Sequence, residues 1–151
     1  MKTILAPVDF SDSSDDVVKA AAELAEVYEG RVVLLHIVQP PVVTSDFGAG
    51  LENLQEIVVL TEKTAAKNLQ RQHAKLTRKG VPVETVLVTG APIPLILQQA
   101  DLSKANFIVM GSHGHTALYD LLVGTTTHGV LKGSPCPVVV LPSKPKPAKK
   151  K

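Results

Sequence analysis

Tryptophan is missing from this 151-residue chain, and aromatic residues make up only 3% of it. Proteins that bind single-stranded nucleic acid stack the bases on aromatic side chains, so the composition argues against that class. The one cysteine, Cys136, cannot form an intrachain disulfide, which agrees with a reducing compartment. No apolar run approaches about 18 residues, and Asp9 lies where a signal peptide would still be apolar. We therefore expect no membrane span and a cytoplasmic location.

An excess of positive charge is also missing from most of the chain. The formal net charge is +2, but five of the 16 basic residues lie in the last eight positions, KPKPAKKK. Residues 1–143 keep 11 basic residues against 14 acidic ones, a net charge of −3. This balance argues against a nucleic acid partner for the folded part. We expect one domain over residues 1–143 and a disordered, Lys- and Pro-rich tail over 144–151.

The usual phosphate-binding fingerprints, GxxxxGK[ST] and GxGxxG, are absent as well. What is present is Gly111, two residues, Gly114, nine residues, Gly124 and then Thr125. Glycine can adopt positive φ and lets an anion approach the main-chain N–H groups. Hydroxyls and the free amides of a following helix supply further donors. The spacing therefore predicts a phosphate site, and the alternative is a tight turn after a strand.

Short apolar runs alternate with helical patterns along the chain. Ser13 and Asp16 are spaced as a capping box for a helix that ends at Gly30. The expected strands are residues 2–8, 31–38, 83–88, 107–110 and 137–141, and further helices begin near Leu51, Pro92 and Gly124. The helix over 51–79 is expected to bury one face, made of Leu54, Val58, Thr61, Ala65, Leu69 and Leu76.

Strands that alternate with helices predict right-handed crossovers and an open, mainly parallel sheet of the α/β class. In such sheets ligands bind beyond the carboxyl ends of the strands, where the strand order reverses. Asp9 ends the first expected strand and Gly111 follows the fourth. We expect these two residues, far apart in the sequence, to meet at one crevice.

Several segments together resemble the universal stress protein family, over Lys2 to Leu141. They are ILAPVDFS, VVLLHIV, IVMGSHG, the glycine signature and SPCPVVVL. The resemblance implies a three-layer, Rossmann-like α/β sandwich with five strands in the order 3-2-1-4-5 and helices on both faces. Family members with this glycine signature bind ATP, and often AMP or ADP. The resemblance therefore implies an adenine nucleotide as ligand, with Mg²⁺ held through its phosphates.

The resemblance also implies a set of binding residues by motif position. Asp9 would accept hydrogen bonds from the ribose or the adenine edge, and the threonines would surround the phosphates at a helix N-terminus. The last strand, Pro137 to Leu141, would pair antiparallel with its copy in a homodimer. The full set of expected nucleotide contacts is Pro7, Val8, Asp9, Ile37, Met110, Gly111, His113, Gly114, Gly124, Thr125, Thr126 and Thr127.

Three positions depart from the family pattern. Asn106 stands where an acidic residue is usual. His115 stands where Lys or Arg is common, so its charge depends on pH. Gly129 interrupts the last expected helix at a cost of about 1 kcal/mol relative to Ala.

Three interpretations of function remain at this point. The leading one is a dimeric stress-response regulator that binds adenine nucleotide, with no catalytic residue and no metal site. The second is a slow ATPase or phosphotransferase, and the third is a dimeric interaction module without nucleotide. For Asp9, a contact to the ligand and a cap on the first helix are both open.

Overall fold

The computed structural model describes residues 1–42, 51–113 and 123–143, so the expected tail lies outside the described residues. Strands and helices alternate along the described chain, as the sequence pattern predicted. In chain order they are β1 (Thr3–Pro7), α1 (Ser14–Val27), β2 (Arg31–Val38), α2 (Leu51–Arg78), β3 (Val83–Thr89), α3 (Pro92–Leu102), β4 (Phe107–Gly111), α4 (Thr125–Gly133) and β5 (Val138–Leu141).

The strands form one parallel sheet in the order β3-β2-β1-β4-β5. This confirms the predicted sheet and its order. From β1 the chain first runs outward through β2 to β3, and then returns to place β4 on the other side of β1. The order therefore reverses between β1 and β4, which is where a parallel sheet leaves room for a ligand.

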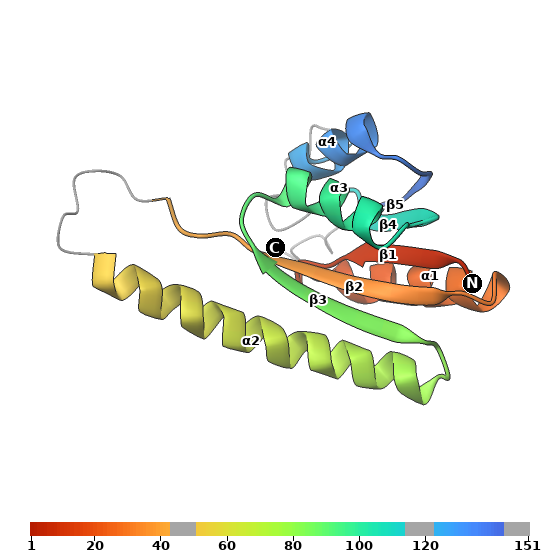
Figure 1. Ribbon diagram of the computed structural model, residues 1–151, viewed down its shortest axis with the longest axis horizontal. Helices are drawn as coiled ribbons and strands as arrows, with labels where there is room; N and C mark the ends of the chain where they lie inside the picture. The colour runs from red at the N-terminus through yellow and green to blue at the C-terminus, as the bar shows by residue number, and fades with distance from the viewer. Residues whose placement is uncertain (43–50, 114–122, 144–151) are drawn as a thin grey trace, which may run out of the picture.

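Helices cover both faces of the sheet, with α1 and α2 on one face and α3 and α4 on the other (Figure 1). Side chains alternate along β1 accordingly. Ile4 and Ala6 belong to the core under α1 and α2, whereas Leu5 belongs to the core under α3 and α4. Because both faces are covered, the central strands are apolar without interruption, and this is why residues 31–38 show no alternation in the sequence.

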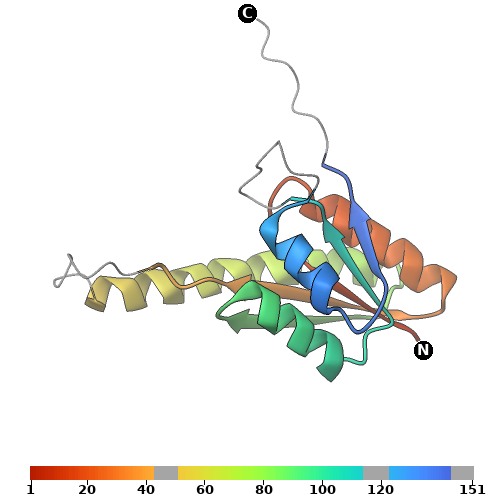
Figure 2. The same cartoon turned by 90° about the horizontal axis from the view of Figure 1, so that it is seen from above.

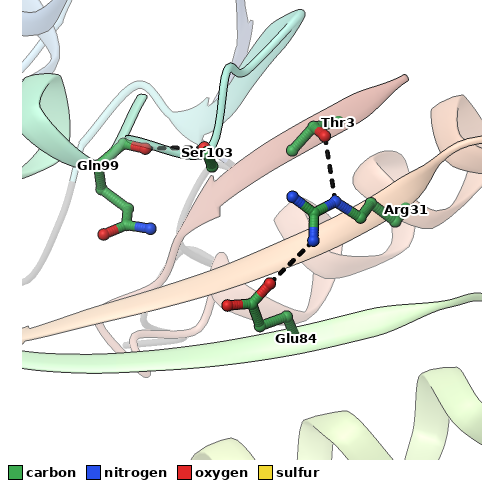
Figure 3. A network of polar contacts seen from close by, with 5 residues as sticks. All are labelled: Thr3, Arg31, Glu84, Gln99 and Ser103. Carbon is green, nitrogen blue, oxygen red and sulfur yellow. Dashed lines mark hydrogen bonds and ion pairs between the residues drawn. The ribbon is translucent and has the colours of Figure 1, made fainter. Parts of the chain in front are cut away.

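A polar network links the amino-terminal ends of three strands (Figure 3). Arg31 of β2 donates from Nε to Thr3 Oγ1 of β1 at 3.2 Å. Its Nη1 lies 2.9 Å from Glu84 Oε2 of β3. The same view shows the last turn of α3, where Ser103 Oγ donates to the carbonyl of Gln99 at 2.7 Å. These contacts lie at the end of the sheet opposite to the crevice, so they support the fold and leave the site open.

The capping box predicted at Ser13 and Asp16 is wrong. Helix α1 begins at Ser14, and Ser13 has αR angles (φ −80°, ψ −12°) without a side-chain cap bond. A serine caps a helix from extended backbone angles, which aim its hydroxyl at the free amides of the first turn. Ser13 instead places its hydroxyl 3.1 Å from that of Ser11.

In the part of α2 whose side chains are described, full burial is confined to the second half, and Leu54 and Val58 of the predicted face are half-buried. Ala65, Leu69 and Leu76 are buried as predicted, but Thr61 is exposed and bonds to the carbonyl of Ile57 at 2.8 Å. The helix has 28 residues, and its first half extends past the end of the sheet (Figures 1 and 2). Periodicity predicts which side of a helix is apolar but not how far the sheet beneath it reaches. None of the described helices combines the length and apolarity that crossing a membrane requires.

Gly129 does not interrupt α4, which runs from Thr125 to Gly133. A Cβ built on Gly129 would lie 2.4 Å from Cδ1 of Ile93 in α3. The glycine therefore allows the two helices on this face to approach closely, and this packing compensates for its low helix propensity.

Candidate functional site

A cavity of about 350 Å³ opens at the carboxyl ends of β1, β2 and β4, at the point where the strand order reverses. The starts of α1, α3 and α4 complete its walls. Such volumes are typical of small-molecule sites in proteins. Its lining residues are Pro7, Val8, Asp9, Ser13, Ser14, Val17, Leu35, Ile37, Gln39, Pro92, Ile96, Met110, Gly111, His113, Gly124, Thr125, Thr126 and Thr127.

Eleven of the twelve residues predicted as nucleotide contacts line this cavity, and the twelfth, Gly114, lies outside the described residues. They come from three strand ends and one helix start that are distant in the sequence. The fold thus brings together the residues that the resemblance selected. Whether they bind a nucleotide remains a prediction.

Val8, just past β1, connects the cavity floor to β2. Its N–H donates to the carbonyl of Leu35 at 2.8 Å, and its own carbonyl lies 2.7 Å from Nδ1 of His36. The His36 ring stacks on Phe10, with centroids 4.4 Å apart. Phe10 has a φ of +60°, so the chain turns sharply here. This turn connects the end of β1 to the start of α1.

Asp9 is held in place by hydroxyls and one amide of the same turn. Its Oδ1 accepts hydrogen bonds from the N–H of Ser11 at 3.0 Å, from the Ser11 hydroxyl, and from the hydroxyl of Ser14 at 3.1 Å. Ser14 is the first residue of α1. Asp9 therefore partly has the alternative role of a cap on the first helix, because its carboxylate stabilises the turn before α1. The residue also lines the cavity, so the structural role does not remove it from the site.

The described glycines of the signature do not adopt the positive φ that the sequence analysis expected. Among the described residues, positive φ occurs at the glycines Gly80 and Gly90, and Gly124 has a φ of −71°. What Gly111 provides is space, since a Cβ there would lie 3.2 Å from Ser13 Oγ. At Gly111 the structure therefore shows a close approach of Ser13, the residue before α1, and not an unusual backbone angle.

Helix α4 points its first turn into the cavity. The N–H of Gly124 donates to the carbonyl of Ser112 at 2.6 Å, and Thr127 Oγ1 donates to the carbonyl of Gly111 at 2.8 Å. These two bonds fix the start of the helix to the end of β4. The first amides of a helix have no partner within it and carry the positive end of the helix dipole. The arrangement suits an anion, and Thr125 and Thr126 line the cavity at this end.

A cluster of two serines and a histidine beside the cavity was not predicted. Ser112 Oγ lies 3.0 Å from Nδ1 of His113 and 2.9 Å from Oγ of Ser143, and Ser143 Oγ lies 3.0 Å from the same Nδ1. The N–H of Ser143 also donates to Ser112 Oγ. Ser143 follows β5, so the cluster links the end of the last strand to His113, which lines the cavity. No short sequence motif joins positions 112 and 143.

Seven further lining residues were also missed, and most of them are apolar. Leu35 lies two residues before Ile37 on the same face of β2, so strand periodicity offered a signal for it. Pro92 and Ile96 belong to α3, and only the packing of α3 over the sheet brings them here. The others are Ser13, Ser14, Val17 and Gln39. No group of three or more His, Cys, Asp or Glu side chains suited to a metal ion occurs in the described parts of the chain.

Comparison with known proteins places this geometry in a family. The model of the universal stress protein family matches residues 1–142. Universal stress protein YxiE of Bacillus subtilis is 31% identical over 143 residues, which cover 91% of this chain and 97% of that protein. The solved structure of protein MJ0577 of Methanocaldococcus jannaschii is 28% identical, with a TM-score of 0.82 over 96% of this chain and 98% of that one.

Two more distant structures were solved with a nucleotide bound. A universal stress protein in complex with cAMP is 21% identical, with a TM-score of 0.64 and coverage of 93% of this chain and 95% of that one. The universal stress protein of Archaeoglobus fulgidus in complex with dAMP is 23% identical, with a TM-score of 0.65 and coverage of 93% and 97%. At these identities the likeness to the present chain is one of fold.

The bond from Thr127 to Gly111 yields a stability prediction. Thr127 is only 3% exposed, and Thr127→Val keeps its shape but leaves the Gly111 carbonyl without this donor. We expect the free energy of unfolding to fall by about 1–2 kcal/mol, measured by urea denaturation. The control is Thr126→Val, because that hydroxyl has no hydrogen-bond partner among the described residues. Equal losses in the two variants would show that the bond does not hold α4 to β4.

Proposed function

The chain belongs to the universal stress protein family, and we propose that it binds an adenine nucleotide, ATP, AMP or ADP, in the cavity at the carboxyl ends of β1, β2 and β4. One observation carries the proposal: the first turn of α4, the Asp9 carboxylate and a group of apolar side chains line the same cavity. A nucleotide needs these three surroundings, for its phosphates, its ribose and its base. The relatives solved with cAMP and dAMP support this choice of ligand class.

The strand order suggests how the nucleotide lies. Because β1 separates β2 from β4, the residues of β2 and the start of α4 line opposite ends of the cavity. Ile37 and Leu35 offer an apolar surface at the β2 end, which suits the base. Thr125 and Thr126 offer amides and hydroxyls at the other end, which suits the phosphates. Asp9, after the central strand, then lies beside the ribose.

Binding rather than turnover is the proposed activity. Phosphoryl transfer requires cations on the terminal phosphate and a group that positions the attacking nucleophile. The described lining of the cavity contains neither Lys nor Arg, and its titratable side chains are Asp9 and His113. Asp9 already accepts hydrogen bonds from the turn before α1. We therefore propose a regulator whose occupancy follows nucleotide concentration, in keeping with a stress-response role.

Isothermal titration with AMP and ATP tests the binding site. We expect one site per chain, and about tenfold weaker affinity for both nucleotides in Asp9→Asn, because a neutral amide is a weaker acceptor for the ribose hydroxyls. The asparagine oxygen can still accept from Ser11 and Ser14, so the turn is preserved. Asp12→Asn is the matched control, since Asp12 is exposed and does not line the cavity. Absence of heat at millimolar AMP and ATP would remove the proposal.

The slow ATPase alternative is tested on the same protein. With the chain saturated by Mg²⁺ and ATP, we expect phosphate release to stay at the rate of a sample without protein. The measurement is a continuous phosphate assay, and the Asp9→Asn variant serves as the second reference. Release above background that is lost in Asp9→Asn would instead establish an enzyme.

The β5 edge of the sheet supports a second part of the proposal, a homodimer. β5 is the last strand in the order, and its partner within the described chain is β4 alone. The carbonyl of Pro137 accepts a hydrogen bond from Ile108 of β4, and that of Leu141 accepts one from Ser112, just after β4. Because backbone groups alternate along a strand, Val138 and Val140 direct their N–H and C=O groups to the outer edge. We propose that this edge pairs antiparallel with the same strand of a second copy.

Val140→Pro tests the dimer, because proline removes an outward N–H and leaves the bonds to β4 in place. We expect sedimentation analysis to show a dimer for the unchanged protein and for the control Val140→Ala, and a monomer for Val140→Pro. Circular dichroism confirms that each variant is folded. A dimer that survives Val140→Pro unchanged would place the interface elsewhere.

A further inference from the structure

Positive charge is concentrated on the second half of α2. The segment from Lys63 to Lys79 contains six Lys or Arg residues and no Asp or Glu. The rest of residues 1–143 contains five basic residues against all 14 acidic ones. The α2 basic ridge, as we name this surface, consists of Lys63, Lys67, Arg71, Lys75, Arg78 and Lys79.

The ridge forms one continuous row of exposed side chains. Its members mostly recur every four residues, a spacing that places successive side chains next to each other on a helix. With a rise of about 1.5 Å per residue, successive cations of the four-residue repeat are about 6 Å apart along the helix axis, and the row extends about 24 Å along it. All six residues are exposed, and they lie away from the buried stripe of Ala65, Leu69 and Leu76. α2 runs along the outside of the molecule, beside β3 (Figure 1).

Carboxylates neutralise little of this charge. In the described parts of the chain, one member of the ridge has an ion pair, Lys75 with Asp15 at 3.7 Å, and Asp15 also accepts from Gln72. The ridge borders a groove of about 370 Å³ between α1 and α2, where Lys19 adds another cation. Cations near a helix C-terminus complement its dipole, but this effect fades within one turn. It therefore accounts for Lys75, Arg78 and Lys79, and not for the three cations of the earlier turns, Lys63, Lys67 and Arg71.

The chemistry of the ridge distinguishes between classes of partner. A protein interface is usually anchored by buried aromatic or apolar side chains, and a membrane surface requires apolar side chains that insert. The exposed large apolar residues of α2 lie in its first half, at Ile57, Val59 and Leu60, and not on the ridge. A row of evenly spaced cations without apolar anchors suits a linear polyanion. Nucleic acid duplexes are such polyanions, and binding their phosphates requires no aromatic stacking.

We propose that the α2 basic ridge binds the phosphate backbone of a nucleic acid duplex without sequence preference. The net charge of residues 1–143 argued against this partner at the level of the sequence. Salt screens the interaction between exposed charges beyond roughly 10 Å, so binding at a surface depends on the charges of that surface and not on the net charge of the chain. Asp15 of α1 contacts the ridge through Lys75, at 3.7 Å, and offsets one of its charges. This inference is independent of the nucleotide cavity.

Fluorescence anisotropy of the full chain with a labelled DNA duplex of arbitrary sequence tests the ridge. The test variant combines Lys63→Gln, Lys67→Gln and Arg71→Gln, since glutamine maintains helix propensity. We expect at least about tenfold weaker binding at 100 mM salt, and a slope of log affinity against log salt that is smaller by about three. A second duplex of unrelated sequence is expected to bind equally well.

The matched control combines Lys2→Gln, Lys104→Gln and Lys132→Gln, which are exposed cations outside the ridge. Both triple variants lose three charges and keep residues 144–151, so any contribution of net charge or of the terminal lysines is the same in both. We expect the control to bind within about twofold of the unchanged protein. Equal loss in the two variants, or no binding by the unchanged protein, would overturn the proposal. Tighter binding to phosphatidylserine vesicles than to the duplex would also overturn it.

Discussion

The junction between the end of β4 and the first turn of α4 is the contact on which the candidate site depends. Two hydrogen bonds form it, from the Gly124 amide to Ser112 and from the Thr127 hydroxyl to Gly111. They position α4 so that its free amides face the gap where the strand order reverses. Without this junction, the helix dipole and the threonines would have no fixed relation to the strand ends. The proposed phosphate end of the cavity therefore depends on the junction and not on any single side chain.

The parallel sheet determines what the junction faces. Its central strands are buried on both sides, so their carboxyl ends are rigid positions for Asp9, Ile37 and Met110. The turn after β1 adds a carboxylate whose orientation is fixed by Ser11 and Ser14. Polar and apolar walls thus meet in a space of nucleotide size, although they come from segments distant in the chain. The serine and histidine cluster further ties the end of β5, the edge strand, to this space.

Acidic and basic residues are concentrated on different helices. The acidic residues Asp15 and Asp16 lie in the first turn of α1, where they complement the helix dipole. The basic residues gather on α2, the outermost helix on the same face. A chain that is nearly neutral in sum therefore has a basic surface on α2. The cavity and the ridge are made of different residues, so the two proposed ligands would not compete for side chains.

Local patterns in the sequence predicted the elements, and the family resemblance selected most of the residues that line the cavity. Apolar runs bounded by glycine or proline located the strands to within one or two residues, and the glycine signature located the turn after β4. Two predictions about helices were wrong. Ser13 has the residue type of a helix cap but the wrong backbone angles, and Thr61 lies on the predicted apolar side where no sheet lies beneath it. Each error concerns a property that depends on neighbours distant in the chain.

The sequence by itself determined the alternation of strands and helices, the family resemblance and the chemical types gathered at the strand ends, because these follow from periodicity and from residue spacing. Tertiary structure decided that Gly111 serves close packing, that Gly129 lets α3 approach α4, and that Ser112 and Ser143 meet at His113. It also decided that the cations of α2 form one exposed row. These features depend on which segments pack against each other in space, and no local pattern encodes that packing.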